Sequence, residues 1–441
     1  MEQRRKNLTQ LFIPICLETL LYMLSGMVDT LMLSSVNDQA VGAVGTANTY
    51  IGIFIIMFSV ISSGMVAVMT QNIGAGRPGV AYQARQLGLA FNAVLGVIMS
   101  LFLSLGAGTI LSGVGVADAL MQPAKTYLQI VGGFCILNAL IPICSSYLRA
   151  FGFSKEPLYA SIIGNVINFC LNAFFLFVLH KGVAGVATAT VISRIINLVI
   201  VVLLGAVLVK AKQHPERESN RAVMGQIIRI GLPSACETAI YNVSMTLVIR
   251  FLNQMDAQGL NVTARSYTMQ ITNFSYCVGA ALAQANAIMT GWHIGAKEYD
   301  ACDRGTKKAA VIGVIVAVIL ETVFTLCSGW IMQLFSKDPQ MVSLVGKLLA
   351  IDIVLEMGRV TNLVYGQALK TSGDAVFPVV MGACFMILCS VGGTYLFGIR
   401  LGLLAVGAYI GMAGDECVRA VGMYLRWKSG KWKEKGLVKS R

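Results

Sequence analysis

The sequence predicts an all-α membrane protein in which twelve transmembrane helices form two six-helix bundles related by a parallel internal repeat. Three observations lead to this prediction. Of the 441 residues, 56% are hydrophobic and only 12% are charged, against roughly 25% charged residues in soluble proteins. Apolar stretches of about twenty residues recur along the chain, and one set of residues recurs in both halves at a constant offset. The composition excludes a disordered chain and most soluble enzymes.

Twelve apolar stretches are long enough to cross a hydrocarbon core about 30 Å thick as helices that rise about 1.5 Å per residue. They are residues 11–34, 46–68, 87–111, 126–148, 158–179 and 183–209 in the first half, and 227–252, 268–290, 309–335, 342–369, 376–397 and 402–427 in the second. The stretch 268–290 is the most polar, since it holds Gln270, Asn273, Gln284 and Asn286. We expect a membrane helix of this kind to face protein or water rather than lipid.

The two halves of the chain carry the same residues in the same order. The recurring residues are Pro14, Glu18, Thr19 and Tyr22 with Pro233, Glu237, Thr238 and Tyr241, then Ile73-Gly74-Ala75 with Ile294-Gly295-Ala296, and Gly152 and Pro157 with Gly373 and Pro378. Because each half has an even number of spans, both halves enter the membrane from the same side, as parallel repeats do. We therefore expect an N-terminal six-helix bundle (1–209), a cytoplasmic linker (210–224), a C-terminal six-helix bundle (225–427) and a basic cytoplasmic tail (428–441).

The positive charges indicate the orientation. The net charge is +13, and most of the 34 Lys and Arg lie on one side of the predicted spans, in the N-terminal flank, the linker, the tail and the loops on that same side. The positive-inside rule then places both termini in the cytoplasm of a multi-pass protein of the plasma (inner) membrane. The basic residues are not gathered on one face, so no nucleic-acid partner is expected. No obligate protein partner is inferred.

The sequence offers no pattern for enzyme or metal chemistry. Most of the eleven Cys lie inside apolar stretches, no CxxC occurs, and the three His are far apart. We therefore expect no cofactor and no catalytic residues. A channel would need filter-like rings or re-entrant loops, which the sequence does not show. Two parallel bundles are typical of alternating-access transporters, although a fold by itself does not establish a function.

Four polar residues of the first half are predicted to lie at one depth, in the outer part of the membrane. Asp29 is in the first span, Asn168 and Asn172 share a face of the fifth, and Thr190 is in the sixth. Oxygen ligands at one level suit either Na⁺ or a protonatable Asp with hydrogen-bonding neighbours. The alternative interpretation is a polar cluster that only packs helices together.

The second half holds a set of ionisable residues near the middle of the predicted membrane. An arginine keeps its charge when buried, so Arg359 requires a carboxylate partner, expected from Glu356, Asp415 or Glu416. Two interpretations stay open for this set: an ion-pair network that stabilises the bundle, or a second site for protons or substrate. Its members are Glu321, Asp352, Glu356, Arg359, Asp415, Glu416 and Arg419.

Several short motifs, taken in order, give the chain its resemblance to a known family. They are Pro14 with Val28-Asp29-Thr30, Gln71-Asn72-Ile73-Gly74-Ala75-Gly76-Arg77, Leu148-Arg149-Ala150-Phe151-Gly152 with Pro157, Asn168, and Gly182-Val183-Ala184-Gly185-Val186-Ala187. With these motifs the chain resembles the MATE (multidrug and toxic compound extrusion) family over essentially its whole length. The tail, from Asp415-Glu416 to Trp432, is similar to one bacterial branch of that family.

The resemblance implies an exporter of amphipathic organic cations that is driven by inward H⁺ or Na⁺. In prokaryotic members the position of Asp29 is associated with ion coupling, together with the positions of Asn168, Asn172 and Thr190. Position 172 is often Asp in that pattern and is Asn here. Arg359 falls where another branch has an acidic residue. One carboxylate instead of two would weaken Na⁺ binding, and this favours H⁺ as the coupling ion.

Two other transporter classes fit the sequence less well. A flippase of the same superfamily, which moves lipid-linked oligosaccharides, would favour a cavity rich in Arg or Lys, yet only Arg194, Lys347 and Arg359 lie inside predicted spans. The major facilitator fold shares the six-plus-six plan. Its characteristic basic loop after the second span is absent, since this chain has Gly74-Ala75-Gly76-Arg77-Pro78 there.

Overall fold

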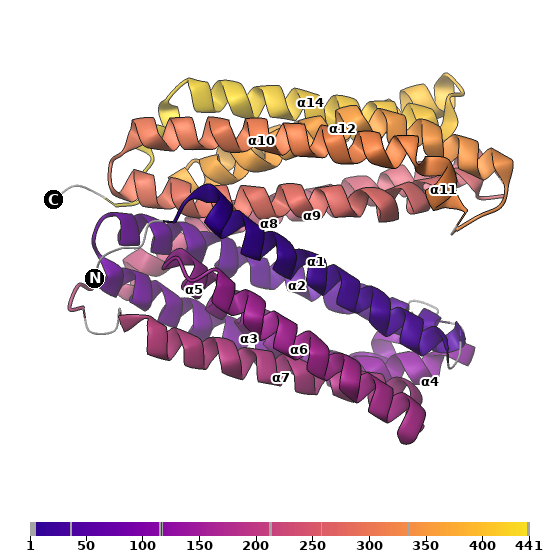
Figure 1. Cartoon of the computed structure of the whole chain (residues 1–441), viewed down its shortest axis with the longest axis horizontal. Helices are drawn as coiled ribbons and strands as arrows, with labels where there is room; N and C mark the ends of the chain where they lie inside the picture. Colours follow the sequence, from indigo (N-terminus) through magenta and orange to yellow (C-terminus); the bar gives the residue numbers. More distant parts are fainter. Residues whose placement is uncertain are drawn as a thin grey trace. The chain divides into compact units, whose positions relative to one another are not determined.

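The computed structural model describes residues 6–35, 38–113, 116, 118–210, 214–256, 258–333 and 335–438, and these residues are helical almost throughout (Figure 1). The chain divides into two compact units, Met1–Leu232 and Pro233–Arg441. The division falls within one long helix, α8 (Asn220–Met255). Residues 211–213 of the predicted linker and 439–441 of the predicted tail lie outside the described residues.

The first unit consists of the helices that precede α8 together with the start of α8 itself. They are α1 (Leu8–Ser34), α2 (Asp38–Gly74), α3 (Pro78–Gly113), α4 (Asp118–Tyr127), the π-helix η1 (Leu128–Gly132), α5 (Ile136–Ala150), α6 (Lys155–Ala173), the π-helix η2 (Phe174–Val178) and α7 (Gly182–Leu208). The segments α4–η1 and α5 are bent by 42° at a short break. Apolar side chains of α2 to α5 and α7, among them Ala47, Leu103 and Leu128, form the core of this unit.

The second unit continues from α8 to the C-terminus. Its elements are α9 (Leu260–Gly295), α10 (Tyr299–Leu326), α11 (Ser328–Met332), α12 (Pro339–Ser372), α13 (Val376–Phe385), the π-helices η4 (Met386–Val391) and η5 (Thr394–Arg400), α14 (Leu404–Lys428) and the 3₁₀-helix η6 (Lys431–Glu434). Helix α12 is central, because it packs against α9, α10 and α14. This position lets it contribute to the charged cluster described below.

The predicted all-helical fold is confirmed, and each of the twelve predicted spans coincides with helical structure among the described residues. The span predicted at 309–335 requires a correction: α10 ends at Leu326, and the short α11 follows after Cys327. The span predicted at 126–148 is built from α4, η1 and α5 rather than from one regular helix.

Length, hydropathy and a low number of charged residues together identify fewer membrane spans than twelve. Within the described ranges, six helices satisfy all three criteria, or eight if each bent pair is one span. Helices α12 and α14 fall short because they carry the ionisable side chains Asp352, Glu356, Arg359, Asp415, Glu416 and Arg419. Charged side chains disqualify an apolar segment without shortening the helix, so the charged cluster itself hides two of the spans.

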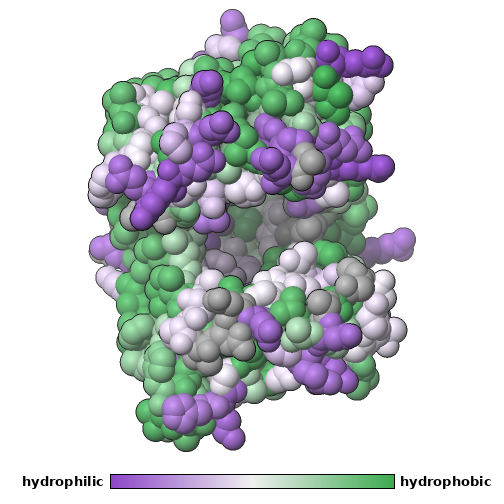
Figure 2. Space-filling view, turned by 90° about the vertical axis from the view of Figure 1, so that its right-hand side faces the viewer, coloured by the Kyte–Doolittle hydropathy of each residue, from purple (hydrophilic) through white to green (hydrophobic). Residues whose placement is uncertain are grey.

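The surface matches a multi-pass membrane protein. Hydrophobic side chains cover wide areas along the flanks of the helices, whereas hydrophilic ones gather at the helix ends that face the viewer in Figure 2. Leu105 of α3 is 83% exposed and Leu326 of α10 is 80% exposed. Apolar surface exposed on this scale is unfavourable in water and is stable against lipid.

Candidate functional site

Three side-chain hydrogen bonds hold α1 and α6 in a constant register. Ser154 Oγ donates to the carbonyl of Gln10 (3.0 Å), Asn165 Nδ2 to the carbonyl of Leu21 (3.4 Å), and Asn172 Nδ2 to Asp29 Oδ1 (2.6 Å). The separations in sequence are 144, 144 and 143 residues. Because both helices rise by about the same amount per residue, this register brings Asp29 level with Asn172.

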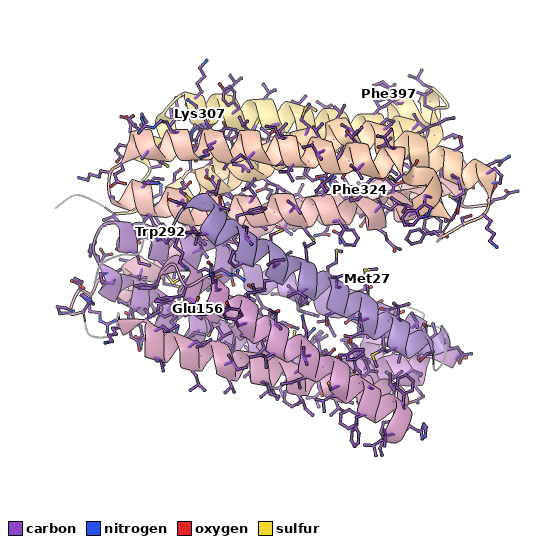
Figure 3. The ribbon with its side chains drawn as sticks, in the orientation of Figure 1. Met27, Glu156, Trp292, Lys307, Phe324 and Phe397 are labelled. Atoms are coloured by element: carbon purple, nitrogen blue, oxygen red, sulfur yellow. The ribbon has the colours of Figure 1, made fainter. Side chains whose placement is uncertain are left out.

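Asp29, Asn168 and Asn172 form a connected polar cluster in the first unit. Asn172 is fully buried, and its Nδ2 also lies 3.3 Å from Oδ1 of Asn168. Asp29 is only half-buried, so protein does not close off this end of the cluster. The side chain of Met27, two residues earlier, projects from the exposed side of α1 (Figure 3). A half-buried carboxylate held by an amide donor can accept a proton or contribute an oxygen ligand.

Thr190 does not join these three residues through its hydroxyl. It lies buried on α7, and its Oγ1 donates to the carbonyl of Val186 at 2.9 Å, one turn earlier in the same helix. Back-bonding of this kind is common for Thr in helices. The structure therefore brings three of the four predicted residues into one hydrogen-bonded cluster and leaves the Thr190 hydroxyl bonded within its own helix.

Arg194 is a neighbour of this cluster that the sequence analysis did not include. It lies one turn after Thr190 on α7, and its guanidinium interacts electrostatically with Asp29. Its Nη1 donates to Oδ1 of Asn138 at 2.9 Å, which holds the charge in place. No ion pair between Arg194 and Asp29 occurs among the described residues. An arginine inside an apolar span was the available signal, since such a charge must face polar groups.

In the second unit, Glu416 of α14 binds two arginines. Arg359 Nε donates to Glu416 Oε1 at 3.4 Å, and Arg419 Nη2 lies 2.9 Å from the same oxygen. Arg359 also pairs with Glu356 through Nη1 and Oε1. Asn362 Nδ2 donates to the second oxygen of Glu416 at 3.1 Å. Arg359 thus contacts two of its three expected partners, Glu356 and Glu416. No contact with the third, Asp415, occurs among the described residues.

Asp415 is instead the partner of Arg419. Arg419 donates to it twice, from Nε at 2.9 Å and from Nη2 at 3.0 Å, and Ser390 Oγ donates to Asp415 Oδ2 at 3.0 Å. All three residues are buried. The two-point contact between planar groups is the strongest form of Arg–carboxylate pairing.

A close approach of α12 and α14 makes this network possible. A Cβ added at Gly358 would lie 2.9 Å from the backbone nitrogen of Cys417. Only glycine therefore fits where the two helix backbones meet. The contact lies beside Arg359 on one helix and Glu416 on the other, and so it sets the distance that their side chains span.

Glu321 and Asp352 lie at the edge of this network and, unlike Asp415 and Glu416, form no ion pair with an arginine among the described residues. Both are buried, with 0% and 2% exposure. Neither oxygen of Glu321 has a hydrogen-bond partner within the described part of the chain, and the same holds for Asp352 Oδ2 and Glu356 Oε2. The predicted charged set thus separates into a paired part around Arg359 and Arg419 and a part made of carboxylates.

An ion pair recurs at equivalent positions of the two repeats. Glu18 of α1 pairs with Arg149 at the end of α5, and Glu237 of α8 pairs with Lys370 near the end of α12, both at 2.6 Å. The recurrence of the two glutamates is visible in the sequence, whereas their partners are visible only in the structure. The relevant signal was the basic residue that precedes the repeated Gly152 and Gly373 by three positions.

Residues 431–437 of the predicted basic tail fold back onto the second unit. The Trp432 ring stacks on that of Trp427, with centroids 4.1 Å apart and planes inclined by 8°. Lys435 Nζ and Arg426 Nε each bind one oxygen of the buried Asp374 at 2.7 Å. Lys307, near the start of α10 (Figure 3), pairs with Asp303, which also accepts from Trp427 Nε1. Part of the tail therefore packs as a folded element.

Comparisons with known proteins identify the family. The MatE family model matches residues 14–174 and 233–396. The uncharacterised transporter YisQ of Bacillus subtilis is 34% identical over 431 residues, which cover 96% of this chain and 94% of that protein. The probable multidrug resistance protein NorM of Thermotoga maritima is 23% identical over 450 residues, with 98% and 94% covered.

Solved structures show the same fold at low sequence identity. A MATE protein in a bent conformation superimposes with a TM-score of 0.88 at 18% identity, covering 97% of this chain and 96% of that one. An outward-facing multidrug resistance transporter gives 0.86 at 18% identity, covering 98% and 96%. At such identities the likeness establishes the fold and does not identify a substrate.

Proposed function

The chain belongs to the MatE family, whose members are transporters and not enzymes, and from this membership we propose that it is a secondary active antiporter. In this proposal it exports amphipathic organic compounds, in particular cations, in exchange for H⁺ or Na⁺ by alternating access. The observation that supports the proposal most strongly is the Asp29–Asn172 hydrogen bond. A carboxylate within a membrane helix is costly, and such residues commonly mark ion or proton pathways.

Exposed polar side chains on long apolar helices support a transport pathway. Asn48 of α2, Asn242 of α8, and Gln270 and Asn273 of α9 are exposed although each lies within a predicted span. Lipid offers no hydrogen bonds, so exposed amides on these helices favour a surface that faces water or a polar ligand, although Asn242 already donates to the carbonyl of Thr238. A pathway wet enough for these amides would accept an amphipathic molecule. Gln284 is half-buried and Asn286 is buried, and neither is needed for this argument.

The names of relatives point to the kind of cargo. The NorM proteins of Thermotoga maritima and Streptococcus pneumoniae are named as probable multidrug resistance proteins. By analogy we propose export of foreign organic compounds here as well. The lipid-linked oligosaccharide flippase considered above gains no specific support from the geometry.

The first polar cluster favours H⁺ over Na⁺ as the coupling ion. Asn172 leaves Asp29 as the only carboxylate of the cluster, and the fixed charge of Arg194 acts on it. Deprotonated Asp29 and Arg194 together carry no net charge. Arg194 opposes any added positive charge, but a proton needs only one carboxyl oxygen, whereas Na⁺ needs several oxygen ligands and this cluster offers one carboxylate. We propose Asp29, Asn168, Asn172 and Thr190 as the coupling site, with Arg194 beside it.

The protein is a multi-pass membrane protein. We propose that it resides in the plasma (inner) membrane with both termini in the cytoplasm, where the basic linker and tail would lie. We also propose that the functional repeats are residues 1–209 and 225–427, joined by the linker 210–224 and followed by the tail 428–441. Its ligands in this proposal are a small amphipathic substrate and the coupling ion.

Ethidium accumulation in an efflux-deficient bacterial host tests this function. Cells that make the protein should accumulate less ethidium than cells with the empty vector. In inverted membrane vesicles, an imposed pH gradient at constant Na⁺ should drive ethidium transport. Transport that follows an imposed Na⁺ gradient and ignores the pH gradient would overturn the choice of ion. Ethidium accumulation equal to that of the vector control, repeated with several organic cations, would overturn cation export.

A further inference from the structure

The buried charges of the second unit do not balance. Five carboxylates, those of Glu321, Asp352, Glu356, Asp415 and Glu416, share one cluster with Arg359 and Arg419. Arg265 is the next buried cation, and it faces Tyr409, which in turn faces Asp352. Even with Arg265 included, two negative charges have no positive counterpart. An isolated ionised carboxylate in a low-dielectric interior is strongly unfavourable.

The excess charge is concentrated at one end of the cluster. On α14, Arg419 pairs with both Asp415 and Glu416. Glu321, in contrast, interacts electrostatically with Asp352 and Glu356 and forms no ion pair in the described chain. Its side chain comes from α10, and Asp352 and Glu356 come from one face of α12. The charged groups that act on Glu321 are Asp352, Glu356 and Arg359. Those that act on Asp352 are Arg359, Glu356 and Glu416.

At the same end of the cluster, hydrogen-bond acceptors outnumber hydrogen-bond donors. Four carboxylate oxygens there have no partner within the described residues: both of Glu321, Oδ2 of Asp352 and Oε2 of Glu356. Ser275 of α9 is 1% exposed and faces Glu321, but the two side chains do not reach ordinary hydrogen-bond geometry within the described residues. This end of the cluster thus holds four acceptor oxygens without a donor, and one hydroxyl group faces Glu321.

We infer that Glu321 and Asp352, with Ser275 beside them, form a second proton-binding site that is separate from Asp29. A proton added to a carboxylate removes one negative charge and creates one O–H donor, so each proton corrects both imbalances at once. The protonated carboxyl of one residue donates to an orphaned oxygen of its neighbour. Ser275 then donates to, or accepts from, Glu321. When the proton leaves, Arg359 and Glu356 are among the charged groups that act on both carboxylates.

This site stands on the structure of the second unit alone and does not depend on the proposed coupling role of Asp29. It predicts that the protein binds more protons than Asp29 can account for. Infrared spectroscopy of the purified full-length protein in detergent measures this directly, since the carbonyl stretch of a protonated carboxyl is separated from the bands of a carboxylate. The measurement requires no transport.

We expect wild type at neutral pH to show a protonated-carboxyl band that is reduced in Glu321→Gln and in Asp352→Asn and lost in the double variant. Gln and Asn are neutral and nearly isosteric with the protonated acids, so these variants should remain folded. Ser275→Ala should retain the band but shift its frequency, because the hydrogen bond to the hydroxyl is lost. Asp29→Asn should leave the band of the second site in place. Asp300→Asn, at an exposed carboxylate of the same helix as Glu321, is the matched control.

Three results would overturn the inference. The first is a double variant with the same protonated-carboxyl band as wild type. The second is a band that disappears in Asp29→Asn alone. The third is a band that NaCl removes at constant pH while choline chloride does not, because the site would then hold Na⁺ instead of a proton. If the double variant fails to fold, Ser275→Ala decides, and an unchanged frequency counts against the site.

Discussion

Glu18 forms an ion pair with Arg149 at 2.6 Å, and the residues at the equivalent places of the second repeat, Glu237 and Lys370, form another at the same distance. Each pair joins the first long helix of a repeat to the end of another helix. Both pairs are largely buried, since every side chain involved is less than 20% exposed. The internal repeat has therefore kept an interaction as well as a sequence pattern, although the cation has changed from Arg to Lys.

Loss of one member of these pairs should destabilise the fold. Glu18→Gln leaves the guanidinium of Arg149 without its carboxylate, and an unsatisfied buried partner costs about 1–3 kcal/mol. We expect the melting temperature of the purified protein to fall. The double variant Glu18→Gln/Arg149→Met should recover part of the loss, because it removes both buried charges. Equal melting temperatures for wild type and Glu18→Gln would show that the pair contributes nothing.

Asp29→Asn should abolish gradient-driven efflux. The substitution keeps the shape of the side chain and its contact with Asn172 but removes the group that accepts a proton. Folded protein should remain in the membrane, which gel filtration in detergent can verify. The matched control is Asp118→Asn, at a carboxylate in the first turn of α4. Normal ethidium efflux by Asp29→Asn would remove Asp29 from the mechanism.

Asn172→Asp should change the dependence on Na⁺. The new carboxylate would lie at hydrogen-bond distance from Asp29, where Asn172 Nδ2 now donates at 2.6 Å. Two adjacent carboxylates repel each other when both are ionised and together attract a cation. Transport driven by a Na⁺ gradient should therefore increase relative to wild type, in vesicles held at one pH. No change in Na⁺ dependence would argue that the two side chains do not share a site.

Arg359→Ala should destabilise the second unit strongly. It leaves Glu356 and Glu416 without one of their cations in a buried cluster, and such a loss typically costs about 3–5 kcal/mol. We expect lower expression and a lower melting temperature. Arg400→Ala is the control, since Arg400 is exposed and contacts only Tyr395 among the interactions described. A fully stable Arg359→Ala protein would contradict a structural role for the network.

The packing of the tail against the second unit should become less stable at acidic pH. Burial disfavours the charge of Asp374, but hydrogen bonds from Arg426 and Lys435 outweigh it and hold the pKa of this loop carboxyl below its ordinary value. Because the pKa of Asp374 is lower in the folded protein, its contribution to stability is complete above the unfolded-state pKa. That contribution is lost as the pH falls through the folded-state pKa. Proteolysis of the tail should therefore accelerate at acidic pH in wild type.

Asp374→Asn provides the comparison for that experiment. It should show fast cleavage of the tail at every pH, because the amide cannot hold both cations as the carboxylate does. Lys433→Ala, at an exposed residue of η6, should behave as wild type. An acid dependence that persists unchanged in Asp374→Asn would assign it to a different group.

The sequence by itself determined the helical fold and the number of long helical segments. Apolar stretches about twenty residues long have few other solutions, since lipid offers no hydrogen bonds to an open backbone. It also identified the charged residues whose burial in a membrane costs enough free energy to require a partner or a function, among them Asp29, Glu321 and Arg359. A charge inside an apolar stretch is visible without any knowledge of its neighbours.

Only the tertiary structure decided which of these residues meet. The constant register of α1 and α6 joins Asp29 to Asn172, whereas the Thr190 hydroxyl bonds to its own helix. Glu416, rather than Asp415, contacts Arg359, because the helix backbones meet at Gly358. Such pairings depend on the rotation and close approach of helices far apart in sequence. A pattern along one helix cannot encode that geometry, since it is set by the packing of all its neighbours.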